Sequence, residues 1–147
     1  MLRTIGGVVA GYLVTSLLVS AMFFGAYLQL GTDGLLVEGG YEPRTGWSVA
    51  SLLLGFGGAL VGGLVSITVG RSMKAATILA SLFLVVGLLM AAMTQSRPAP
   101  APPAPRTGSP GFQEMVQNGR EPTWVSFSNP VIGGVGVLLG ARLKKCR

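Results

Sequence analysis

The side chains that carry most enzymatic chemistry are scarce in this chain of 147 residues. It has no histidine and one cysteine, Cys146, so no Cys/His cluster is available for zinc, haem or an iron–sulfur centre. None of its 11 basic and 5 acidic residues falls inside a long apolar run. Proton relays and ion-coupled transporters need ionisable groups at membrane depth, so the sequence disfavours those functions. We predict no catalytic residue, no metal site and no cofactor.

Three carboxylates in one polar segment leave an enzymatic alternative open. Asp33, Glu38 and Glu42 lie between the first two apolar runs. Hydrolysis or group transfer needs paired carboxylates, or a nucleophile beside a base. If these three side chains converge, they could act on a lipid at the membrane surface.

Asn129-Pro130 is the most distinctive polar group inside an apolar run. Proline leaves a backbone carbonyl unpaired one turn earlier, and Ser126 or Asn129 can satisfy it. One interpretation is a kinked, hydrated cavity that binds a small molecule or a lipid headgroup. The other is a tolerated kink near the membrane surface. A channel or transporter would instead need a line of polar residues facing one cavity: Ser16, Ser20, Ser66, Thr68, Ser126 and Asn129.

Four apolar runs are available to position these groups. We predict a single membrane domain over 1–147, with four spans and two longer loops. The spans are residues 5–30, 47–70, 75–94 and 124–141, and the loops are 31–46 and 95–123. Each run approaches the ~20 residues that a hydrocarbon core of about 30 Å requires.

Two of these runs have alternative interpretations. The first follows Arg3 and could be a signal peptide, but at about 26 residues it exceeds the usual 7–15 of a signal core, which favours an uncleaved helix. The last run is short and contains Pro130, so a re-entrant segment is its alternative. The basic tail that follows favours a full crossing.

The loop 95–123 changes character along its length. Residues 98–105 read PAPAPPAP, which favours an extended polyproline II spacer. Ser109 and Pro110 then resemble the start of a helix that Gly119 would end. We predict a short helix here that lies on the membrane surface.

The distribution of charge predicts the orientation. Seven basic residues and no acid lie at the chain ends and in the turn after the second run: Arg3, Arg71, Lys74, Arg142, Lys144, Lys145 and Arg147. The other two loops hold four basic residues and all five acids. The positive-inside rule then places both termini in the cytoplasm, and the Pro-rich loop outside. Trp47 and Trp124 begin the second and fourth runs on that outer side, as interfacial anchors.

Small residues recur at helical spacing in three of the runs. They predict faces on which another helix can approach closely. The predicted packing residues are Gly7, Gly11, Gly55, Gly58, Ala59, Gly62, Gly63, Ser66, Gly136 and Gly140. Gly134-x-Gly136-x-x-x-Gly140 has the wrong spacing for a dinucleotide fingerprint and follows no strand, so we interpret it as helix packing.

The opening MLRTIGGVVAGYLV, the Gly-rich second helix with its basic turn and the ending GVLLGARLKK resemble small bacterial four-helix integral membrane proteins. The resemblance implies an all-α four-helix bundle in the bacterial inner membrane, and it brings no catalytic residues.

Three functional hypotheses follow from these patterns. The first is a non-enzymatic accessory subunit that packs against a larger membrane complex through its small-residue faces. The second is a small homo-oligomeric transporter or channel, and the third is a lipid-binding or lipid-modifying protein at the outer face. The expected partners are membrane lipids and other membrane-protein subunits or further copies of the chain. Nucleic acid is not expected, because no basic patch with interleaved aromatics lies outside the spans.

Overall fold

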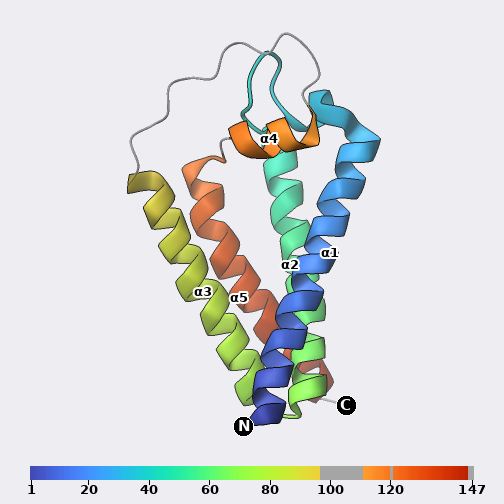
Figure 1. The fold of residues 1–147 in the computed structure, drawn as a ribbon, viewed down its shortest axis with the longest axis vertical. Coiled ribbons are helices and arrows are strands. Elements are labelled where there is room, and N and C mark those ends of the chain that lie inside the picture. Colours follow the sequence, from blue (N-terminus) through green and yellow to red (C-terminus); the bar gives the residue numbers. More distant parts are fainter. Residues whose placement is uncertain (97–110, 120, 146–147) are drawn as a thin grey trace.

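The structure, a computed structural model, describes residues 1–96, 111–119 and 121–145. Within them the chain forms five helices: α1 (Leu2–Leu35), α2 (Thr45–Gly70), α3 (Met73–Ser96), α4 (Phe112–Asn118) and α5 (Thr123–Lys145) (Figure 1). The Pro-rich stretch 98–105, the predicted helix start at Ser109-Pro110 and Cys146 lie outside the described residues.

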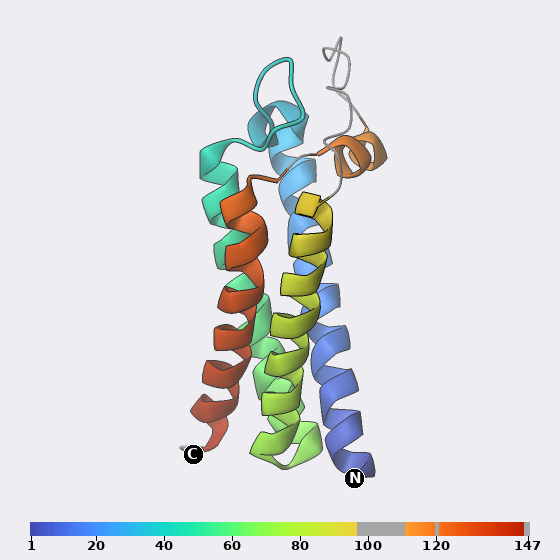
Figure 2. The ribbon, with the colours of Figure 1, turned by 90° about the vertical axis from the view of Figure 1, so that its left-hand side faces the viewer.

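Four of these helices, α1, α2, α3 and α5, are long and apolar enough to cross a membrane. This confirms the predicted all-α bundle with four candidate spans, and it gives the chain the make-up of a multi-pass integral membrane protein. The start of α1 and the end of α5 lie at one end of the bundle, which we call the terminal end (Figures 1 and 2). Residues 36–44 and α4 lie at the opposite end, which we call the loop end.

The first helix extends past the predicted span into the predicted loop. Gly31 interrupts it with φ 61° and ψ −178°, a backbone conformation that glycine adopts without a steric penalty. One further turn then follows to Leu35, and the N–H of Leu36 closes it on the Thr32 carbonyl at 2.8 Å. The extra turn forms because Leu35 and Leu36 find apolar partners in the loop.

The loop after α1 folds on a small apolar core of its own. Leu35, Leu36 and Tyr41 are buried together, with Tyr27 and Trp47 packed against them. The backbone supports this turn, since the Val37 N–H donates to the Glu42 carbonyl at 2.9 Å. This small core fixes residues 36–44 over the ends of α1 and α2.

Helix α2 is the central helix, with α1 on one side and α5 on the other. Its contact with α1 depends on glycine: a Cβ added to Gly7 would lie 2.6 Å from the Ser66 carbonyl oxygen, and one added to Gly58 would lie 2.7 Å from Val19. Backbones can approach this closely only where side chains are absent.

The opposite side of α2 packs on α5 in the same way. A Cβ on Gly63 would collide with the backbone of Val137, and one on Gly140 with the backbone of Leu60. Gly136 lies against Ala59, with 2.9 Å between an added Cβ and the Ala59 Cβ. All ten predicted packing residues therefore contact helices of this same chain.

Helix α3 completes the bundle through the main core, which sits toward the terminal end. That core consists of Ala59, Ala76, Leu79, Ala80, Val137 and Ala141. A tight turn leads from α2 to α3, with Arg71 in the left-handed region at φ 49°. The helices are thus held together most closely at the terminal end.

Candidate ligand-binding cavity

A cavity of about 1270 Å³ opens among the four long helices in the loop half of the bundle. Figure 1 shows α3 and α5 diverging from α1 and α2 toward the loop end. The cavity wall combines residues of all four helices with residues of the segments at the loop end. Its volume exceeds the 300–1,000 Å³ of common small-molecule sites, so it can hold a bulky ligand.

The cavity begins where the close helix contacts end. At its floor the Tyr12 ring of α1 lies 6.0 Å, centroid to centroid, from the Phe83 ring of α3. Beyond this contact Thr15 and Val19 of α1 and Gly87 of α3 line the cavity. The two helices that touch near the terminal end thus become opposite walls toward the loop end.

The cavity is about as deep as one leaflet of a membrane. At 1.5 Å per residue, the part of α3 between its lining residues Phe83 and Gln95 is about 18 Å long. A hydrocarbon core of about 30 Å has leaflets of about 15 Å, so the floor lies near mid-membrane if α3 spans the bilayer.

Polar residues line the cavity at two levels. Those at the mouth, close to the helix ends, are Glu42, Thr45, Thr94, Gln95, Asn118, Glu121 and Thr123. Those farther inside are Thr15, Ser16, Ser51, Ser126 and Asn129. The Ser51 hydroxyl donates to the Ser48 carbonyl of its own helix at 2.8 Å. Thr15 is satisfied within its own helix, because its hydroxyl donates to the Gly11 carbonyl at 2.8 Å. The remaining inner groups offer hydrogen-bonding capacity at a depth where the bilayer supplies none.

The structure brings Ser126, Asn129 and Pro130 together on one wall of this cavity. Asn129 is exposed there, and among the described residues its amide has no hydrogen-bond partner. Gly55 of α2 faces it, since an added Cβ would lie 3.2 Å from Asn129 Oδ1. Pro130 packs on Gly87 of α3, where an added Cβ would lie 2.5 Å from the proline ring. The amide therefore presents two donors and an acceptor to the cavity interior.

Two carboxylates, Glu42 and Glu121, lie at the mouth. Desolvation by burial among the atoms of the wall raises the pKa of Glu121 above its ordinary value of 4.5. The residue as a whole stays exposed, so water screens this effect and the bias toward the neutral acid is modest.

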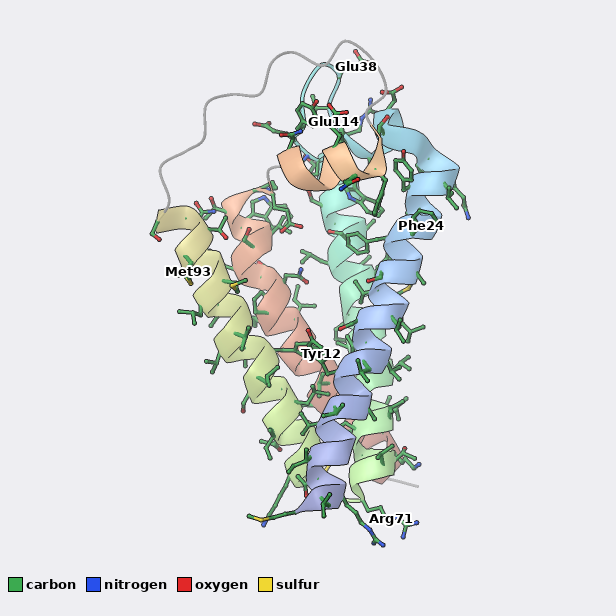
Figure 3. The ribbon with its side chains drawn as sticks, in the orientation of Figure 1. Tyr12, Phe24, Glu38, Arg71, Met93 and Glu114 are labelled. Carbon is green, nitrogen blue, oxygen red and sulfur yellow. The ribbon has the colours of Figure 1, made fainter. Side chains whose placement is uncertain are left out.

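Helix α4 lies across the loop end and is fastened to α1 by aromatic contacts (Figures 2 and 3). The Phe112 ring sits 5.6 Å from the Phe24 ring and 5.1 Å from the Tyr27 ring, both edge-on. The Tyr41 hydroxyl donates to Glu114 Oε1 at 2.6 Å, which joins α4 to the loop. Asn118, the last residue of α4, lines the mouth of the cavity.

The polar residues predicted to line a channel do not all face the cavity. Of the six polar residues expected along a channel, Ser16, Ser126 and Asn129 line the cavity. Ser66 is instead buried between α1 and α2, and Thr68 accepts a hydrogen bond from Lys144 Nζ at 2.7 Å.

The loop carboxylates Glu38 and Glu42 do not share one site, and the two tryptophans have different surroundings. Glu42 lines the cavity mouth, whereas Glu38 is exposed at the loop end, away from the cavity lining (Figure 3). Within the described part of the chain, no group of three or more His, Cys, Asp or Glu residues could hold a metal ion. Trp47 packs edge-on against Phe23, with ring centroids 5.3 Å apart, and Trp124 is 48% exposed.

Sequence reasoning missed several residues of the cavity lining. Ser51 lies one turn before Gly55 on α2, and Glu121 lies two residues before α5. Ser51 was detectable in principle, because its position four residues from Gly55 places it on the same helical face. Nothing in the sequence indicated that Asn118 and Gln95 would reach the same opening.

No protein-family model, no curated protein and no solved structure matches this chain.

Proposed function

We propose that this chain is a non-enzymatic membrane protein that binds a lipid-like amphiphile in the cavity at its loop end. The observation that carries the proposal is the cavity of about 1270 Å³, with an apolar body, a polar mouth and a polar inner group at Asn129. An amphiphile matches this order, because its headgroup can stay among the mouth residues, an ester carbonyl below the headgroup can accept from the Asn129 amide, and its tail can occupy the apolar depth.

The position of the cavity supports the same conclusion. Its depth is close to the length of a lipid tail in one leaflet. Val19, Phe23, Phe83 and Met90 offer apolar surface to such a tail. The charge distribution predicts that the loop end faces outward, so the ligand would come from the outer leaflet.

Asn129→Leu tests the proposal. The chain is purified in an uncharged detergent, stripped of lipid and titrated with a mixture of phosphatidylethanolamine and phosphatidylglycerol. We expect the lipid to raise the unfolding temperature of the unmodified chain, because a ligand at about 100 times its Kd stabilises by about 2.7 kcal/mol. Asn129→Leu should assemble normally and lose this lipid-dependent shift, because leucine cannot hydrogen-bond in the cavity.

Gln29→Leu is the matched control. It makes the same change from amide to isobutyl group on the exposed surface of α1, outside the cavity lining. It should keep the full lipid-dependent shift. Equal shifts in the unmodified chain and in Asn129→Leu would contradict the proposal, since the lipid would then act on the outer surface of the bundle.

The accessory-subunit hypothesis stays a prediction, but the small-residue faces expected to bind a partner pack against helices of the same chain. The small-residue faces that suggested it are packed inside the bundle, so a partner would have to contact other surfaces. The homo-oligomeric channel also stays a prediction, with three of its six polar residues away from the cavity. Co-purifying proteins would favour the first, and a symmetric oligomer the second.

A further inference from the structure

The charged residues at the cavity mouth indicate which lipid headgroup the cavity binds. This inference rests on the proposed function. The described lining residues include two carboxylates, Glu42 and Glu121, and neither lysine nor arginine. They belong to different segments, the loop before α2 and the approach to α5.

The described cation nearest to Glu42 in the sequence has its own hydrogen bond within the loop. Arg44 Nε donates to the Leu36 carbonyl at 3.0 Å, and Arg44 is not among the lining residues. The Arg71 and Lys144 side chains lie at the terminal end, the opposite end of the bundle (Figure 3). Among the described residues that line the cavity, the charged side chains are therefore both carboxylates.

We infer that the ligand of this cavity is a membrane lipid whose headgroup carries a primary ammonium, placed between Glu42 and Glu121. An ammonium offers three donors, and carboxylates are acceptors that form strong charge-assisted hydrogen bonds with it. Thr45 and Thr123, also at the mouth, supply hydroxyls for the other polar atoms of the headgroup.

The raised pKa of Glu121 fits this assignment. Desolvation disfavours its carboxylate, and a cation close to it favours the charged form again. Ammonium binding should therefore weaken in acid, where the Glu121 carboxyl becomes neutral.

The experiment compares two lipids that differ only in the group beyond the phosphate. The full chain is exposed to equal amounts of phosphatidylethanolamine and phosphatidylglycerol with identical acyl chains. Native mass spectrometry then gives the ratio of the two lipids retained. We expect the ammonium lipid to be enriched roughly fivefold, the size expected from exposed ion pairs acting together.

Substitution at the mouth separates the carboxylates from the rest of the cavity. In the double variant Glu42→Gln with Glu121→Gln, the ratio should fall to about one while the total lipid retained stays similar. The control is Glu38→Gln, which removes one carboxylate charge from the loop end without touching the cavity lining. It should keep the enrichment. Unfolding temperatures of the two variants and of the unmodified chain verify that each protein is folded.

The outcomes separate the inference from the proposed function. Equal retention of both lipids by the unmodified chain would overturn the ammonium assignment and leave lipid binding intact. A preference for phosphatidylglycerol would also overturn it, because cations would then dominate the mouth. Retention of neither lipid would contradict the proposed function itself. Enrichment that persists in the double variant would show that the carboxylates are not its cause.

Discussion

Two glycines of α2, less than two turns apart, differ in whether packing allows a side chain at their position. Gly63 faces α5, and a Cβ there would overlap the backbone of Val137. Gly57, on the same helix, has open space at its Cβ position. Backbone atoms cannot move aside as a flexible side chain can. Of these two glycines, packing therefore requires only Gly63.

Gly63→Ala should therefore destabilise the bundle, and Gly57→Ala should not. Overpacking in a close-packed interior costs about 1–3 kcal/mol, so the unfolding midpoint of Gly63→Ala in detergent should fall by several degrees. Gly57→Ala should be neutral or slightly stabilising, because alanine favours the helix over glycine by about 1 kcal/mol. Equal midpoints for the two variants would contradict the close α2–α5 contact.

At the scale of elements, α4 is a short helix whose order depends on its partners. Its seven residues are too few for a stable isolated helix in water. Phe112 packs on the rings of α1, and Glu114 accepts from Tyr41. These contacts, made outside the helix itself, hold α4 at the mouth of the cavity.

Tyr41→Phe removes the hydroxyl from this arrangement and keeps the ring. A hydrogen bond to a charged group contributes about 1.5–3 kcal/mol, and partial exposure reduces that value. We expect amides of α4 to exchange with deuterium roughly threefold to tenfold faster than in the unmodified chain. Tyr12→Phe is the control, because Tyr12 contacts Phe83 through its ring. Unchanged exchange in Tyr41→Phe would show that the aromatic contacts alone hold α4.

At the scale of the whole molecule, the bundle is narrow at the terminal end and open at the loop end. Small residues bring the helices together near the chain ends, while the loop core and α4 support the opposite end. This asymmetry leaves space beside Asn129. The small-residue faces are already used within one chain, so they provide no free surface for a second copy.

We therefore expect a monomer with retained lipid after purification in mild detergent. Native mass spectrometry should give the mass of one 15.1 kDa chain plus bound lipid. Co-purifying membrane proteins would support the accessory-subunit hypothesis instead. A symmetric oligomer without lipid would contradict the proposed function and favour the channel.

The orientation has a separate test. A reporter enzyme that is active only in the periplasm, fused after Arg147, should be silent, because seven basic residues at the chain ends and in the turn after the second span favour a cytoplasmic location. The same reporter inserted after Glu38, in the loop, should be active. The reverse pattern would invert the topology and move the cavity to the cytoplasmic side.

The sequence by itself determined the four candidate spans and the all-α class. Hydropathy over a window of about 20 residues depends on composition alone, so helices such as α2 and α3 can be recognised without knowledge of their neighbours. The small residues of α2 also indicated close packing, because their spacing of four places them on one helical face. Asn129-Pro130 indicated a polar site through its unusual location in an apolar run.

Only the tertiary structure decided what those features contact. Periodicity shows that Gly63 faces a helix, but it cannot distinguish α5 of the same chain from a helix of another protein. The cavity exists because the helices diverge, and the divergence is the sum of contacts between residues far apart in the sequence, such as Gly87 with Pro130. Glu42 and Glu121 line one cavity for the same reason, since the packing of the four helices brings their segments to it.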